Sequence, residues 1–144
     1  MNYQTLLSRA DAAGVFHLPA GARGDLVTAA QANGMTVFEV GLAHAHNKAE
    51  MLGTIARVMA FPAWFGINYD ALLDCLADLH WCPAEGYLVL LDHCDGIHGL
   101  AGEDFATSLD IFAEAARIWC EQGIPFWCLV NMQADGIASL PDLA

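Results

Sequence analysis

Two nearly continuous apolar runs dominate the hydrophobic pattern of the chain. Residues 86–93 have the sequence GYLVLLDH, and residues 124–130 have the sequence IPFWCLV. Runs of this length without polar alternation are typical of parallel strands that are buried on both faces. A third strand is predicted over residues 35–42, MTVFEVGL, which is rich in β-branched and aromatic residues.

Apolar residues at helical spacing predict the segments between these strands. Asn47 and Glu50 have the spacing of a capping box, and the helix that follows them must end before Pro62. Asn68 is placed to cap a second helix, and residues 103–123 form a third. The order strand, helix, helix, strand, helix, strand predicts an α/β sandwich of two or three layers, with a small, mainly parallel sheet of three strands packed by helices.

The first 34 residues form an alanine-rich extension ahead of this pattern. We expect a helix over residues 4–13, a brief edge strand at VFHL before Pro19, and a helix over residues 24–34. No repeat or low-complexity linker interrupts the chain. We therefore predict a single domain over residues 1–144, made of an extension (1–34), a core (35–131) and a C-terminal tail (132–144).

Composition and charge narrow the function classes. The 144 residues are 56% hydrophobic, which is enough for one packed core. Seventeen acidic residues against five basic ones give a net charge of −12, which disfavours binding to nucleic acid and favours a cationic partner. The apolar runs are shorter than the ~20 residues that span a bilayer, and the start of the chain lacks a signal-peptide pattern. We expect a cytoplasmic protein without membrane contact.

The candidate cofactor and metal ligands are scattered. The five cysteines form no CxxC pair, so we expect free thiols rather than a disulfide framework or a zinc ribbon. His44 with His46, and His93 with His98, would form a metal site only if folding brought them together. Nucleotide-binding, hydrolase and metalloprotease motifs are lacking in the sequence. We predict no cofactor and no catalytic site.

One helix carries an unusual stripe of like charge. Asp70, Asp74 and Asp78 recur every four residues, an arrangement that costs a helix about 0.2–0.5 kcal/mol per adjacent pair. The stripe is open to four interpretations: a solvated face, a general acid–base pair, a magnesium site, or a surface for a basic protein. Trp64 and Phe65 directly precede the helix, and large aromatic residues of this kind favour an interaction surface.

Residues 61–79, FPAWFGINYDALLDCLADL, resemble the barstar family of intracellular ribonuclease inhibitors. The shared pattern is Pro, one residue, two aromatics, Gly, one residue, Asn, one residue, Asp-Ala-Leu, one residue, Asp-Cys-Leu. The order of elements extends the resemblance over residues 35–131. The resemblance implies a three-stranded parallel sheet. It also implies a protein that is not an enzyme, and whose helix and preceding loop block the active site of a small basic ribonuclease.

The resemblance also implies roles for individual residues. Asp74 is the main anchor in place of a substrate phosphate, Asp70 pairs with further basic side chains, and Trp64 packs on the catalytic histidine of the enzyme. Glu114 matches an acidic residue at the rim of the contact. The complete set of implied partner-binding residues is Trp64, Phe65, Gly66, Asn68, Tyr69, Asp70, Leu73, Asp74, Asp78 and Glu114.

Three features depart from the family pattern. Leu73 stands where the family prototype has an aromatic residue, and the segment after the helix is longer, which leaves the roles of His80 and Trp81 open. The prototype has no counterpart of residues 1–34, which could brace the sheet edge, mediate self-association or contact another target. Two alternative functions stay open: a binding module for another basic partner, and a magnesium-dependent phosphodiesterase.

Overall fold

A computed structural model describes residues 2–133, 136–137 and 140–143 of the chain. Within this part, four parallel strands form one sheet in the order β1-β4-β3-β2. The strands are β1 (Val15–His17), β2 (Thr36–Gly41), β3 (Tyr87–Asp92) and β4 (Phe126–Val130).

The prediction of a three-stranded sheet is therefore wrong, although the edge strand at VFHL was expected. Val15 lies opposite Cys128, so this short strand extends the sheet beside β4. A strand of three residues carries too little pattern to indicate its neighbour. Its pairing is a long-range contact between segments more than 100 residues apart.

Six helices connect and cover the strands in the described part of the chain. They are α1 (Tyr3–Leu7), α2 (Arg23–Ala32), α3 (Lys48–Val58), α4 (Tyr69–Asp78), α5 (Asp95–Leu100) and α6 (Gly102–Glu121). Helix α1 is shorter than expected, and α5 lies in a segment for which the sequence pattern predicted no helix. The buried side chain of Ile97 holds α5 against the core, which outweighs the poor helix propensity of glycine.

Both predicted asparagine caps are present. The Asn68 side chain accepts a hydrogen bond from the Ala71 amide at 2.8 Å, and Asn47 accepts one from the Glu50 amide at 2.9 Å. The second half of the expected capping box differs, because Glu50 accepts from the His46 amide at 3.0 Å. Each cap satisfies an amide that has no partner within the helix, and the start of α4 is thereby defined.

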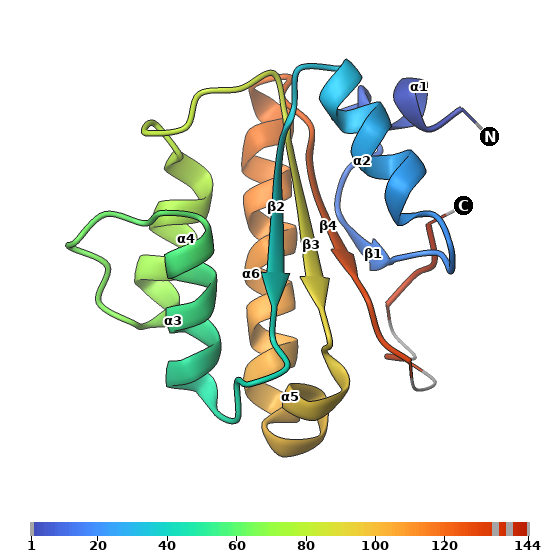
Figure 1. Cartoon of the computed structure of the whole chain (residues 1–144). Coiled ribbons are helices and arrows are strands. Elements are labelled where there is room, and N and C mark those ends of the chain that lie inside the picture. Colours follow the sequence, from blue (N-terminus) through green and yellow to red (C-terminus); the bar gives the residue numbers. More distant parts are fainter. Residues whose placement is uncertain (1, 134–135, 138–139, 144) are drawn as a thin grey trace.

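The helices lie on both faces of the sheet, so the sandwich has three layers. In Figure 1, α6 lies behind the sheet with α3 and α4 beside it, whereas α2 lies at the other side next to α1. The alternation along β3 explains this arrangement, because Val89 and Leu91 belong to the cluster of α3, α4 and α6. Leu88 and Leu90 belong to the cluster of α1 and α2.

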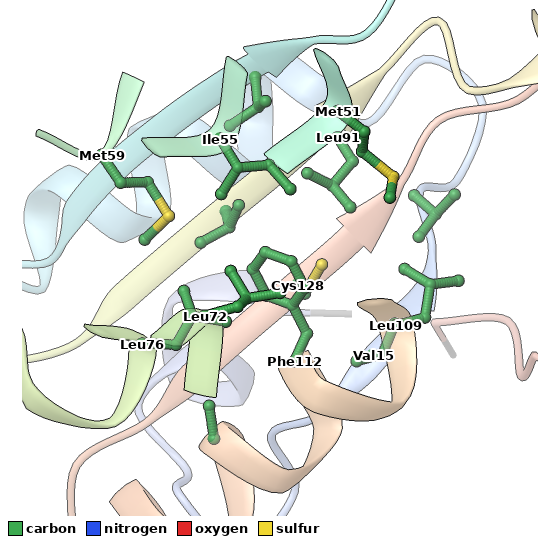
Figure 2. Packing of buried hydrophobic residues seen from close by; sticks show 14 of the residues in the cluster. Val15, Met51, Ile55, Met59, Leu72, Leu76, Leu91, Leu109, Phe112 and Cys128 are labelled. Atoms are coloured by element: carbon green, nitrogen blue, oxygen red, sulfur yellow. The ribbon is translucent and has the colours of Figure 1, made fainter. Parts of the chain in front are cut away.

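The larger cluster positions the acidic helix. Leu72 and Leu76 of α4 are fully buried and point toward the space between α3 and α6 (Figure 2). Helix α3 lies above the same space and contributes Met51 and Ile55, and Met59 follows directly after the helix. Because one face of α4 is held in this way, its opposite face is directed to solvent.

The extension of residues 1–34 is built into the sheet. The Trp127 indole in β4 donates to the Leu7 carbonyl at 3.0 Å. The Arg23 guanidinium pairs with Glu39 of β2 at 2.5 Å and also with Asp92 at the end of β3. Of the three roles left open for the extension, bracing the sheet is the one that these contacts describe.

Candidate functional site

The aspartates of α4 lie on its exposed face, opposite the buried residues Ala71, Leu72, Cys75 and Leu76. The Nδ1 atom of His80 lies 2.8 Å from the Oδ2 atom of Asp78, within hydrogen-bond and ion-pair distance. Within the described residues, neither Asp70 nor Asp74 has a basic side chain at ion-pair distance. These two carboxylates thus carry charge that the fold leaves uncompensated.

The thiol of Cys75 lies beneath this charged face. Burial, followed by the negative charges of Asp74 and Asp78, raises the pKa of Cys75 to about 11. A thiol that stays protonated at neutral pH adds no charge to the helix. Cys75 is therefore a packing residue, and the acidic character of α4 comes from its aspartates.

The loop between α3 and α4 presents two large apolar side chains to solvent. This loop projects outward at the left of Figure 1. Trp64 is 55% exposed and Ile67 is 50% exposed. The other three tryptophans, Trp81, Trp119 and Trp127, each donate an indole hydrogen bond to a backbone carbonyl. Trp64, for which a contact role was predicted, is thus accessible to solvent, whereas the sequence did not point to Ile67.

Phe65 is only partly exposed and packs against the larger core cluster. Its ring centroid lies 5.1 Å from that of Phe61, which in turn lies 6.1 Å from the ring of Trp81. The Trp81 indole donates to the Met59 carbonyl at the end of α3. Phe65 and Trp81 therefore anchor the base of the loop, and this assigns the uncertain Trp81 a structural position.

Asn68 joins the loop to the helix through both ends of its amide. Its Nδ2 atom donates to the Gly66 carbonyl at 3.3 Å, while its Oδ1 atom caps α4. A Cβ atom at Gly66 would lie 2.9 Å from Asn68 Nδ2. The family resemblance implied that Gly66 is one of the partner-binding residues. In the structure the close neighbour is Asn68.

Tyr69 connects the first turn of α4 to neighbouring helices. Its hydroxyl donates to Asp104 Oδ1 of α6 at 2.6 Å, and Lys48 Nζ of α3 lies 4.1 Å from the centre of its ring. Burial, followed by the hydrogen bond and charge of Asp104, raises the pKa of Tyr69 far above its ordinary value. Tyr69 is half-buried and holds α4 in place.

Leu73 and Glu114 lie at the edge of the acidic face. Leu73 is half-buried and packs against the larger core cluster. Glu114 of α6 pairs with Arg117, whose nitrogen atoms lie 2.5 and 3.0 Å from its carboxylate oxygens, and this contact lowers the pKa of Glu114. Unlike Asp74, Glu114 already has a cationic partner in the free protein.

The described residues contain no group of three or more His, Cys, Asp and Glu side chains arranged to hold a metal ion. His44 and His46 do not combine with other ligands there, and His46 instead contacts Glu50 at 3.3 Å. None of the helices in the described ranges has the length and apolar character needed to span a bilayer.

These features define a three-layer α/β protein with an exposed acidic helix and an apolar loop beside it. The model of the family described as "Barstar (barnase inhibitor)" matches residues 35–131, which is most of the chain. The chain belongs to the barstar family. The matched range coincides with the core expected from the sequence, and residues 1–34 precede it.

Two further comparisons concern the whole chain. A search of curated proteins finds no match. Among solved structures, the ADP form of the ORC2 protein of Aeropyrum pernix is similar, with a TM-score of 0.58 and 20% sequence identity. The match covers 98% of this chain and 39% of that protein, and at this identity it shows a shared fold alone.

Proposed function

We propose that the protein inhibits a small basic ribonuclease by covering the active site of the enzyme with α4 and the loop before it. The observation that carries this proposal is the pair of exposed aspartates, Asp70 and Asp74, for which the described residues provide no cationic partner. The chain also belongs to a family whose description names barstar as the barnase inhibitor, and this membership supports the same proposal.

The electrostatics of the chain suit such a partner. Asp74 is proposed as the anchor that takes the place of a substrate phosphate, with Asp70 pairing with further basic groups. Neither carboxylate has to give up an intramolecular ion pair within the described residues in order to bind arginine or lysine. The net charge of −12 attracts a cationic enzyme over a distance and accelerates the encounter.

The remaining candidate residues divide into contacts and supports. Trp64 is proposed as a direct contact because it is exposed in the loop that leads into α4. Gly66, Asn68 and Tyr69 are proposed to shape the contact, since they set the path of the loop and the position of α4. The list of proposed supporting or peripheral positions is completed by Phe65, Leu73, Asp78 and Glu114.

Glu114 is proposed to contribute less than Asp74. Binding to the enzyme would require Glu114 to exchange Arg117 for a cation of the partner, and an exchange of one exposed ion pair for another gains little. Asp74 makes no such exchange, so a new charge pair forms on binding.

The test is titration of a small basic ribonuclease of the barnase type with the protein and with two variants. Asp74→Ala removes the proposed anchor. Asp25→Ala removes the same charge from α2, on the opposite face of the sheet, and serves as the matched control. We expect stoichiometric inhibition by the parent and by Asp25→Ala, and none by Asp74→Ala at the same concentration.

Salt provides the second readout. Association of the parent with the enzyme should slow as salt is raised, because attraction between opposite charges is screened. Equal inhibition by Asp74→Ala and the parent would contradict the proposed anchor. Binding to a basic protein without inhibition of any ribonuclease would support the binding-module alternative instead.

A further inference from the structure

Ile67 has a backbone conformation that is unfavourable for its residue type. Its φ angle is 51°, in the left-handed region that glycine and asparagine adopt readily. Isoleucine branches at Cβ, so this conformation crowds its side chain against the backbone. Half of Ile67 is nevertheless exposed to solvent, so packing against the core does not fully offset the strain.

The other non-glycine residues with left-handed φ angles in the described ranges are easier to explain. Leu79 is fully buried, so its side chain gains from core packing. Ala60 has only a methyl group, and His93 lacks the Cβ branch. Ile67 thus combines a β-branched side chain, a left-handed backbone and an exposed position.

The local backbone explains the turn but not the side chain. Asn68 is extended, with a φ angle of −141°, and its amide holds the Gly66 carbonyl on the other side of Ile67. The chain therefore has to turn at position 67. Glycine or asparagine would make this turn with less strain, so a large apolar side chain here calls for a reason outside the free fold.

Trp64 is the other large apolar side chain that this loop exposes to solvent. Trp64 is 55% exposed and precedes the acidic face that begins at Asp70. We infer that Trp64 and Ile67 form an apolar contact that docks on an apolar patch beside the cationic active site of the ribonuclease, and that Ile67 thereby contributes to the choice of enzyme. This inference rests on the proposed function.

Charge complementarity identifies the occupant. A partner seated on this surface has to satisfy the carboxylates of Asp70 and Asp74 and cover the two apolar side chains at once. A basic cleft with an apolar margin meets both demands. Because the loop is already held by Asn68 and by the packing of Phe65, binding has little backbone to order.

This contact should differ from that of Asp74 in its response to salt. Burial of apolar surface is insensitive to moderate salt, and contacts that form after the encounter act mainly on dissociation. Loss of the Ile67 side chain should therefore speed dissociation, while leaving the association rate and its salt dependence unchanged. Loss of the Asp74 side chain should alter both the association rate and its salt dependence.

The experiment uses Ile67→Gly, Ile67→Asn and Ile67→Leu in the full-length chain, with a panel of small basic ribonucleases that includes barnase. Ile67→Gly and Ile67→Asn should weaken inhibition of a ribonuclease that the parent inhibits by about 10- to 100-fold, as expected when one buried isoleucine side chain is removed. Their midpoint of urea unfolding should stay the same or rise, because the strain is relieved. Ile67→Leu should retain most of the affinity.

The outcomes separate this inference from the proposed function. Unchanged inhibition by Ile67→Gly, with Asp74→Ala inactive, would overturn the inference and leave the proposed function standing. A fall in stability that accounts for the weaker inhibition would also overturn it, because Ile67 would then be structural. If the parent inhibits no member of the panel, the proposed function and this inference fall together.

Discussion

The Tyr69 hydroxyl donates a 2.6 Å hydrogen bond to the Asp104 carboxylate and so ties the first turn of α4 to the start of α6. The two residues are 35 positions apart in the sequence. Asp70, the first aspartate of the acidic face, directly follows Tyr69. The direction in which the acidic face points therefore depends on this contact as well as on the buried leucines of α4.

Replacement of Tyr69 by phenylalanine should destabilise the protein. The variant keeps the ring that packs beneath Lys48 but loses the hydrogen bond to a charged acceptor, so the free energy of unfolding should fall by about 1.5–3 kcal/mol. Urea unfolding measures the change. A midpoint equal to that of the parent would show that water replaces the hydroxyl at Asp104 without loss.

The same contact predicts a dependence of stability on alkaline pH. The pKa of Tyr69 is raised in the folded protein, so the folded state retains a proton that the unfolded chain loses near its ordinary pKa of about 10. The contribution of Tyr69 is therefore complete below pH 10 and declines as the pH rises above it. We expect unfolding free energies from pH 9 to 11 to fall more steeply for the parent than for Tyr69→Phe. Parallel curves would contradict this linkage.

Asp74→Ala should lose inhibition without losing stability. Asp74 lies one turn from both Asp70 and Asp78, so removal of its charge relieves two repulsive contacts, and alanine is the better helix former. The free energy of unfolding should be unchanged or higher by up to about 1 kcal/mol. Thermal or urea unfolding tests this, and a large loss of stability would instead assign Asp74 a structural role.

The extension should be part of the cooperative fold rather than an appended arm. Leu26 of α2 is fully buried in the cluster that covers the second face of the sheet. Leu26→Ala should lower the free energy of unfolding by about 2–5 kcal/mol, whereas Thr28→Ala on the exposed face of the same helix should change it little. We propose that residues 1–34 and 35–131 unfold in one transition. A separate transition that carries the whole Leu26 effect would contradict this.

The five thiols should differ in their reactivity toward alkylation. Burial raises the pKa of Cys75 to about 11 and that of Cys94 to about 12, and it raises the pKa of Cys128 strongly as well. Cys82 and Cys120 are only partly buried. At pH 8 in the native protein, iodoacetamide should modify Cys82 and Cys120 first, as read by mass spectrometry, and the other three should react only after unfolding. Early labelling of Cys75 would contradict the packing described for α4.

Local sequence patterns predicted much of the site. Apolar runs predicted β3 and β4, the spacing of Asn68 and the leucines predicted α4, and the aspartate stripe predicted its acidic face. Each of these signals depends on residues within a few positions of one another. These elements and the acidic face could therefore be predicted without knowledge of the tertiary structure.

Other features of the site follow from contacts between distant segments. Trp64 and Phe65 are adjacent aromatic residues, and no local pattern indicated that Phe65 would turn inward toward Phe61 while Trp64 stayed exposed. The tie from Tyr69 to Asp104 and the left-handed turn at Ile67 were likewise not predicted. Exposure and strain at these positions depend on how α3, α4 and α6 pack together.

The sequence by itself determined the class of the longer elements, the asparagine caps of α3 and α4, the excess of negative charge and the resemblance to the barstar family. Only the tertiary structure decided that residues 15–17 add a fourth strand, that the extension covers the second face of the sheet, and which loop side chains remain exposed. The physical reason is the separation along the chain of the residues that interact. Periodicity and capping act between neighbours along the chain, whereas strand pairing and burial depend on surfaces that meet only when the whole chain has folded.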